Sequence, residues 1–168
     1  ATRYPDELSG GQRQRVSLAR AIAPGPSLLL MDEPLSALDA DLRISMRKEI
    51  KKIHRATGAT VVFVTHDQGE ALSMSDRIMD LKDGCVEQLG TPEEIYLQPK
   101  TPFVASFIGR CNFIHGKWDG NTFHTAEGQF VFKGQPVADI FHQEEVCPIR
   151  PEQMHMNQLG KGIPAVVR

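Results

Sequence analysis

Two stretches of the sequence combine residue types that could bind a phosphate and activate a water molecule. In the first, Ser9 precedes Gly10 and Gly11, and Gln12 completes an S-x-x-Q capping box at the start of a helix. Glycines leave the unpaired N–H groups at a helix start accessible, and the helix dipole favours an anion there. The helix is expected to end near Ala23, because prolines follow. This spacing allows a phosphate site, although an ordinary capped helix explains the same residues.

The second stretch is a pair of carboxylates, Asp32 and Glu33, that follows an apolar run. Residues 28–31 predict a strand that is buried on both faces of a parallel sheet. Open α/β sheets bind their ligands at the carboxyl ends of the strands, which is where these two acids fall. One carboxylate can hold a hydrated Mg²⁺ while its neighbour polarises the attacking water. A second buried strand is expected over residues 61–64, and it ends just before His66.

A basic, amphipathic helix follows the polar turn 36–39. Asp39 is expected to cap a helix from Ala40 to Arg55, and Gly58 is expected to end it. Apolar residues at helical spacing predict one buried stripe: Leu42, Met46, Ile50 and Ile53. Basic residues decorate the other faces: Arg43, Arg47, Lys48, Lys51 and Lys52. A basic helix can indicate nucleic acid, but the acidic remainder and the regular stripe favour a surface helix of an α/β layer.

The middle of the chain predicts a β-hairpin. Residues 77–81 and 85–89 are rich in apolar and β-branched side chains, and they flank an Asp83-Gly84 turn. Asp80 is unusual inside the first of these strands. Its presence suggests that one face of that strand meets solvent.

Two helix starts precede a change of pattern at Gly109. Thr91 and Thr101 are each followed by proline, as expected of an N-cap and the first helical position. Beyond Gly109 the helical spacing disappears, and short apolar clusters separated by glycines predict small β-strands in a barrel-like module. The clusters are Phe113-Ile114, Phe123, Phe130–Phe132, Val137 and Ile140-Phe141.

Composition excludes several classes of protein. The 168 residues carry a formal net charge of −2 with 24% charged residues, so no strong field attracts nucleic acid. The three cysteines, Cys85, Cys111 and Cys147, show no C-x-x-C spacing, so they are expected to be free thiols outside any disulfide or metal site. No apolar run is long enough to span a bilayer, and no signal peptide is recognised. Any membrane role is therefore expected to depend on a partner.

Four motifs in order resemble the ATPase subunit of an ABC transporter. They are LSGGQ at 8–12, LLLMDEP at 28–34, SALD at 36–39 and the strand that ends in Thr65-His66. The resemblance covers residues 1 to about 109. Residues 149–152, with the sequence IRPE, resemble a motif of the OB-like regulatory domain of sugar-, iron- and polyamine-importer ATPases. The resemblance implies an α/β fold: a partial P-loop ATPase domain over 1–109, followed by an incomplete, β-rich OB-like domain over 110–168.

The resemblance also implies roles for individual residues. In this family two ATPase subunits pair head to tail and enclose two ATP molecules. The ATP-binding residues implied are Ser9, Gly10, Gly11, Gln12 and Asp39, of which Asp39 crosses the dimer interface. Asp32 would serve Mg²⁺, Glu33 would orient or deprotonate water, and His66 would hold the γ-phosphate. The nearby arginines, Arg13, Arg15 and Arg20, either form a solvated face or order the LSGGQ loop.

The whole protein implied by this resemblance hydrolyses ATP to drive solute uptake. Its partners would be a second ATPase subunit, transmembrane permease subunits and, indirectly, a periplasmic or lipid-anchored solute-binding protein, with no nucleic acid. It would lie at the cytoplasmic face of the inner membrane as a peripheral subunit. Iron, polyamine, sugar and phosphonate importers share these motifs, and residues 103–113 resemble ferric-importer ATPases, which favours ferric iron.

One required motif is missing. A complete ATPase of this kind needs a G-x-x-x-x-G-K-[ST] loop to cradle phosphates, and the 168 residues contain none. We therefore expect the chain to be a fragment that lacks the P-loop half and is inactive alone. Two alternatives stay open: a soluble ABC-type ATPase without a membrane partner, and a catalytically silent fragment.

Overall fold

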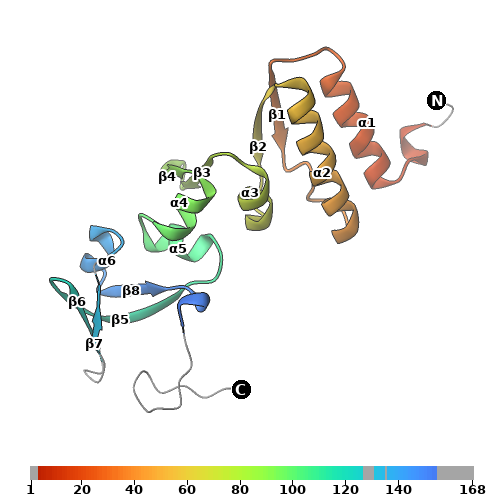
Figure 1. The fold of residues 1–168 in the computed structure, drawn as a ribbon. Coiled ribbons are helices and arrows are strands. Elements are labelled where there is room, and N and C mark those ends of the chain that lie inside the picture. The colour runs from red at the N-terminus through yellow and green to blue at the C-terminus, as the bar shows by residue number, and fades with distance from the viewer. Residues whose placement is uncertain (1–3, 127–130, 135, 155–168) are drawn as a thin grey trace. The chain divides into compact units, whose positions relative to one another are not determined.

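A computed structural model describes residues 4–126, 131–134 and 136–154. Close contacts divide the chain into two compact units, Ala1–Ser75 and Asp76–Arg168 (Figure 1). Helices and strands are mixed in the chain, as the α/β class predicts. The expected division after residue 109 refers to the domains of a family, and it stays a prediction.

The first unit contains a pair of parallel strands, the helix α2 that connects them, and the helices before and after them (Figure 1). Its elements are the 3₁₀ helix η1 (Pro5–Glu7), α1 (Gly10–Ile22), β1 (Leu28–Asp32), α2 (Ala40–Thr57), β2 (Thr60–Val64) and α3 (Gln68–Met74). The parallel pairing aligns Leu28 with Thr60 and Asp32 with Val64. The predicted caps are confirmed: Ser9 and Gln12 form a capping box on α1, and Asp39 caps α2.

One face of this strand pair carries the core of the first unit. The buried side chains of β1 pack with those of α2 and of the turn between them: Leu29, Met31, Leu35, Leu38, Met46 and Ile50. The predicted stripe on α2 is confirmed at Met46 and Ile50, which are buried. Leu18 and Ile22 of α1 pack against the same cluster. Both α1 and α2 therefore cover the same face of the strands.

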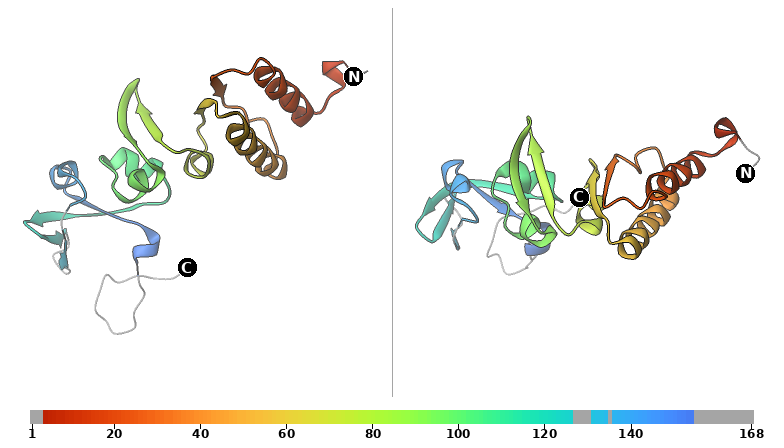
Figure 2. Two further views of the ribbon diagram at one scale, coloured as in Figure 1. Left: turned by 45° about the horizontal axis from the view of Figure 1, so that its top comes forward. Right: turned by 90° about the horizontal axis from the view of Figure 1, so that it is seen from above.

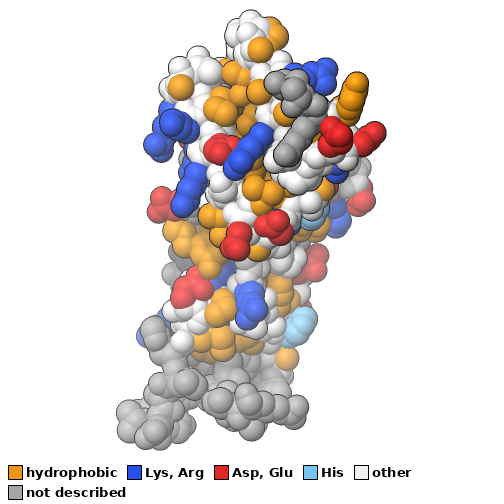
Figure 3. All heavy atoms as spheres, turned by 90° about the vertical axis from the view of Figure 1, so that its right-hand side faces the viewer, with side chains coloured by type: hydrophobic (Ala, Val, Ile, Leu, Met, Phe, Trp, Pro, Cys, Tyr) orange, Lys and Arg blue, Asp and Glu red, His pale blue; other side chains and the backbone are white. Residues whose placement is uncertain are grey.

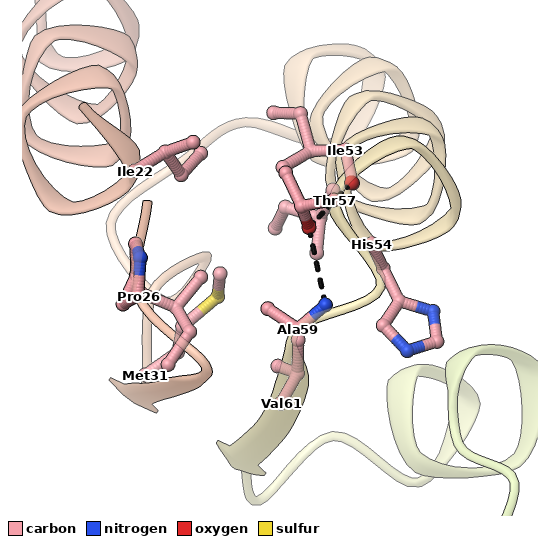
Figure 4. A pocket seen from close by; sticks show the side chains of 10 residues that line it. Ile22, Pro26, Met31, Ile53, His54, Thr57, Ala59 and Val61 are labelled. Carbon is pink, nitrogen blue, oxygen red and sulfur yellow. Dashed lines mark hydrogen bonds between the residues drawn. The ribbon is translucent and has the colours of Figure 1, made fainter. Parts of the chain in front are cut away.

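A small apolar pocket lies among α1, α2 and the strands (Figure 4). Ile22 and Pro26 line one side, and Ile53 of α2 lines the other. The Thr57 hydroxyl donates to the Ile53 carbonyl at 2.9 Å and accepts from the Ala59 amide at 3.4 Å, so the polar atom is satisfied locally. The pocket reaches the amino end of β2, away from Asp32, and belongs to the core of the unit.

The opposite face of the strand pair is exposed. Leu30 is 70% exposed, and Leu28, Val62 and Val64 are each about half exposed. The expectation of a strand buried on both faces is therefore wrong for the described structure. Successive side chains of a strand point to opposite faces, and here helices cover only one of them.

The second unit begins with a hairpin and two short helices (Figures 1 and 2). Its strands β3 (Ile78–Lys82) and β4 (Cys85–Gly90) pair antiparallel, as predicted. Asp83 and Gly84 have φ angles of 51° and 79°, so the predicted two-residue turn is confirmed. The helices are α4 (Pro92–Leu97) and α5 (Pro102–Phe107), which Thr91 and Thr101 cap as expected.

The remainder of the second unit is a four-stranded antiparallel sheet in the order β7-β6-β5-β8. The strands are β5 (Asn112–Asp119), β6 (Thr122–Thr125), β7 (Val131–Lys133) and β8 (Val146–Ile149), with helix α6 (Asp139–Gln143) before β8 and the 3₁₀ helix η2 (Pro151–Gln153) after it. Small β-strands are thus confirmed at several predicted clusters. Residue 130 lies outside the described residues.

The cluster Ile140-Phe141 is the exception, because it lies on α6 and not on a strand. Phe141 is fully buried and packs with Ala105 and Val146. A helix of five residues is too short to show a 3.6-residue period, and a pair of apolar residues fits either state. Val137 lies in a bend outside the strands.

The three cysteines are free, as predicted. Cys85 is exposed, whereas Cys111 and Cys147 are partly buried. Burial, with a contribution from Cys111, raises the pKa of the Cys147 thiol to about 11. Its sulfur is therefore held as a thiol at neutral pH.

One face of β3 meets solvent, but it is the face that carries the apolar neighbours of Asp80 and not Asp80 itself. Asp80 is 5% exposed, while its neighbours Met79 and Leu81 are each 54% exposed. Among the described residues, its Oδ2 atom is buried without a hydrogen-bond partner. Burial raises the pKa of the Asp80 carboxyl, and the nearby Glu87 adds to that rise.

Replacing Asp80 should stabilise the protein. We expect Asp80→Val to raise the free energy of unfolding at pH 7 by about 1 kcal/mol, because it removes a buried carboxylate whose Oδ2 atom has no hydrogen-bond partner. The folded-state pKa of this acid is raised, so its penalty is present above that pKa and fades as pH falls towards 3.8. Thermal unfolding of both proteins across this pH range measures the difference. A gain that is equal at low and neutral pH would contradict the electrostatic explanation.

Candidate functional site

The carboxyl ends of β1 and β2 bring three of the predicted site residues to one place. Asp32 is the last residue of β1, and the Glu33 amide donates to the Val64 carbonyl at 2.9 Å, which extends the strand pairing by one residue. Glu33 has a φ of 42°, a left-handed conformation that is uncommon for a residue with a side chain. The Ser36 hydroxyl donates to the Glu33 carbonyl at 2.9 Å and holds this turn.

Glu33 and His66 are directly hydrogen-bonded. The Nδ1 atom of His66 lies 2.9 Å from Oε1 of Glu33. A carboxylate only accepts, so Nδ1 carries the proton and Nε2 remains available to a ligand. The side chains are 72% and 46% exposed, so both are accessible. The hydrogen bond and charge of Glu33 raise the pKa of His66 above its ordinary 6.5, and the charges of Asp67 and Glu70 add smaller contributions.

The start of α1 forms the second predicted part of the site. The Ser9 Oγ atom accepts from the Gln12 amide at 3.3 Å, and Gln12 Oε1 accepts from the Ser9 amide at 3.0 Å. Arg13 donates to the Leu8 carbonyl at 2.8 Å, so this arginine orders the loop before the helix. Arg15 instead pairs with Glu49 on the surface of α2.

The two glycines at this helix start have different surroundings. A Cβ atom at Gly10 would meet no other atom within 4 Å, as expected of an open helix start. A Cβ atom at Gly11 would overlap the side chain of Leu42, and Gly11 is buried. The bare position at Gly11 thus lets α1 approach α2 closely, a reason that the sequence did not show. Whether its backbone also binds a ligand stays a prediction.

One hydrogen bond connects α1 to the turn that follows β1, and another places Asp39 at the start of α2. The Gln14 amide group donates to the Pro34 carbonyl, one residue beyond Glu33. The Asp39 Oδ1 atom accepts from the Leu42 amide at 2.8 Å and begins α2. The described structure thus joins Glu33 and His66 directly, and it holds Ser9 and Asp39 at the starts of two helices in the same unit.

A group of charged residues behind His66 was not predicted as part of the site. Arg43 contacts Asp67 and Glu70, and the Thr65 hydroxyl donates to Glu70 at 2.7 Å. The sequence placed Arg43 on a solvated helix face, but its side chain is only 29% exposed. The sequence feature that could have predicted this group is the pair of acids at 67 and 70. Two carboxylates at the start of a short helix need a counter-charge when one of them is buried.

The donor set near Asp32 bears on metal binding. Within the described residues, no group of three or more His, Cys, Asp or Glu side chains could hold a metal ion. Asp32 is exposed at the strand end and offers one carboxylate. Such a set fits Mg²⁺, which is usually bound through one or two carboxylates together with waters and substrate phosphates.

Charged side chains of both signs lie on the visible face of the molecule (Figure 3). Figure 3 shows Lys and Arg side chains interspersed with acidic and hydrophobic ones over the visible face. Across the described part of the chain, every helix is too short or too polar to cross a bilayer.

Comparisons with known proteins agree with the motifs. The family described as "ABC transporter" matches residues 1–36. The spermidine/putrescine import ATP-binding protein PotA of Pseudomonas fluorescens is 49% identical over 161 residues, which cover 93% of this chain and 43% of that protein. The sulfate/thiosulfate import ATP-binding protein CysA of Caulobacter vibrioides is 53% identical over 158 residues, which cover 94% of this chain and 45% of that protein.

A solved structure is also similar. It is a dimeric structure of a post-hydrolysis state of an ATP-binding cassette bound to ADP and Pi, with 43% identity and a TM-score of 0.49. The match covers 55% of this chain and 39% of that chain.

Motif order and sequence identity together define an ATP-binding cassette. The chain belongs to the ABC transporter ATP-binding proteins, and the two relatives above are named for import. It spans less than half the length of the two curated relatives described above. Those relatives are named for polyamine and sulfate import, so they give the expectation of ferric iron no support.

The contact between Glu33 and His66 can be tested by titration. We expect the His66 imidazole to titrate above 6.5 and Glu33→Gln to lower its pKa, because the carboxylate stabilises the protonated ring. A histidine with a raised folded-state pKa adds stability that is complete below its unfolded pKa and is lost as pH rises through the folded value. Ring chemical shifts in NMR measure the midpoint. An unchanged midpoint in Glu33→Gln would show that the Glu33 carboxylate does not set the pKa of His66.

Gly10 and Gly11 should respond differently to alanine. We expect Gly11→Ala to destabilise the protein by about 1–3 kcal/mol, because the new methyl group overlaps Leu42. Gly10→Ala is the matched control and should not lower stability, because the space around Gly10 is open and alanine restricts the unfolded chain more than glycine does. Chemical denaturation measures both. Adding Leu42→Ala should recover part of the loss in Gly11→Ala, and equal effects of the two single changes would refute the packing explanation.

Proposed function

We propose that the protein containing this sequence is the ATP-hydrolysing subunit of an ABC importer. The observation that carries the proposal is the hydrogen bond between Glu33 and His66 at the carboxyl ends of two adjacent parallel strands, next to Asp32. Relatives named as import ATP-binding proteins, at 49% and 53% identity, support it further. The partners proposed are a second copy of the subunit and transmembrane permease subunits, at the cytoplasmic face of the membrane.

In this proposal Glu33 orients or deprotonates the attacking water. Its backbone is held by Val64 and Ser36, and its carboxylate is held by His66, so little reorganisation is needed before proton transfer. Protonated His66 donates its Nε2–H to the γ-phosphate, and the positive charge favoured by its raised pKa compensates the negative charge there. In this proposal Glu33 accepts a proton from water and also orients the His66 ring.

Asp32 would hold Mg²⁺ when ATP is bound. The metal ion would neutralise phosphate charge, and one protein carboxylate would suffice because Mg²⁺ commonly takes its other ligands from water and substrate phosphates. Asp32 precedes Glu33 directly, so the turn that fixes the general base also fixes the metal ligand.

The start of α1 would act on the ATP of the other subunit. Ser9, Gly10, Gly11 and Gln12 would contact its γ-phosphate, and Asp39 would reach across the dimer interface. The open space around Gly10 and the positive end of a 13-residue helix support this role. Each ATP site would then be complete only in the closed dimer, which couples hydrolysis to motion of the permease.

The solute classes to test first are polyamines and sulfate, for which the relatives are named. A solute-binding protein outside the membrane would deliver either one. Uptake of labelled spermidine, putrescine and sulfate by cells that express the complete transporter decides between the two classes.

Glu33→Gln in the full-length protein should separate binding from hydrolysis. We expect ATP binding to persist and turnover to fall about 100-fold or more, because an amide keeps the shape but cannot accept the proton. The closed dimer should then accumulate with ATP, visible by size-exclusion chromatography. Glu49→Gln, a surface carboxylate on α2, is the control and should retain turnover. Near-normal turnover in Glu33→Gln would remove Glu33 from the role of base.

A further inference from the structure

Arg43 on α2 contacts the two segments that flank the candidate site. Its Nη2 atom donates to the Leu38 carbonyl at 3.1 Å, directly before Asp39. Its Nη1 atom lies 3.4 Å from Asp67 Oδ2, directly after His66, and its Nε atom lies 3.8 Å from Glu70 Oε1. One guanidinium group therefore spans the turn that leads to Asp39 and the loop that carries His66.

The loop that carries His66 depends on the buried acid of this group. The Glu70 side chain is 4% exposed, and its carboxylate accepts from the Thr65 hydroxyl at 2.7 Å. The Asp67 amide donates to the Thr65 hydroxyl at 3.0 Å, and Asp67 accepts from the Glu70 amide at 2.9 Å. A buried carboxylate is costly unless a positive charge compensates it, and Arg43 is the cation beside it.

We propose that Arg43 is a positioning residue that holds the Leu38–Asp39 turn and the Thr65–Asp67 loop in one fixed relation. This rests on the proposed function, in which Asp39 meets the other subunit while His66 acts on ATP held by its own. Movement of the dimer interface would then be transmitted to His66 through one side chain. Arginine suits this position because its planar fork presents several donors in fixed directions, whereas lysine offers one compact charge.

The packing of α2 on α3 has another support. The Lys51 Nζ atom donates to the Ser73 carbonyl at 2.5 Å, two helical turns along α2 from Arg43. Removing Arg43 therefore leaves a contact that keeps the two helices together. The role of Arg43 is thus separable from helix packing, and Lys51 provides a matched control.

The test uses Arg43→Gln and Arg43→Lys in the full-length protein. We expect kcat for ATP hydrolysis to fall about 10- to 100-fold in both, since small displacements of positioned groups cost this much, while KM for ATP changes little. Lys48→Gln removes an exposed charge from the same helix, and Lys51→Gln removes the other contact to α3. Both controls should retain kcat. Normal kcat in the Arg43 variants, or an equal loss in Lys51→Gln, would overturn the proposal.

A second pair of measurements separates positioning from charge compensation. Adding Glu70→Gln to Arg43→Gln removes the uncompensated buried charge, so it should restore the melting temperature but not kcat. Restoration of both would overturn the proposal. Hydrogen exchange gives a readout independent of turnover: the amides of Leu42, Asp67 and Glu70 should exchange faster in Arg43→Gln and not in Lys51→Gln. Unchanged exchange in Arg43→Gln would overturn the proposal that Arg43 holds the turn and the loop together. Absence of turnover in the unmodified protein would instead refute only the proposed function.

Discussion

The parallel pairing of β1 with β2 is the constraint on which the candidate site depends. Its register aligns Asp32 with Val64, and the Glu33 amide extends the pairing to the Val64 carbonyl. This places the carboxylate of Glu33 within hydrogen-bond distance of His66. A shift of one residue would move every side chain of a strand to the opposite face, so the core and the site are fixed by the same pairing.

The close approach of α1 to α2 sets the position of the LSGGQ segment in the same way. Gly11 allows the two helices to meet at Leu42, and Gln14 connects α1 to the Pro34 carbonyl. Because Pro34 follows Glu33, α1 contacts the same turn that carries Glu33, the residue proposed as the general base. Backbone pairing, close helix packing and side-chain contacts to backbone carbonyls therefore all contribute to the geometry of the site.

The sequence predicted the local features well and the tertiary ones less well. The Ser9 capping box, the Asp39 cap and the Asp83-Gly84 turn each depend on residues close together in the chain, and each was found as expected. The exposed face of β1 and the buried carboxylate of Asp80 depend on which other segments cover a strand. Arg43 was also misplaced, because its acidic partners lie at the cap and in the first turn of another helix, 24 and 27 residues along the chain. The roles of the site residues were predicted from family resemblance, since spacing alone left an ordinary capped helix open.

Arg150 gives a physical reason for the motif at 149–152. It is 5% exposed, it donates to the carbonyls of Tyr96, Ala105 and Ile108, and it stacks on the Tyr96 ring at 4.3 Å. Carbonyls at helix C-termini carry partial negative charge, so they compensate the guanidinium without a carboxylate. Glu152 instead accepts from the Tyr96 hydroxyl at 2.6 Å. These contacts fix β8 to the ends of α4 and α5, which explains why the hairpin, those helices and the four-stranded sheet form one compact unit.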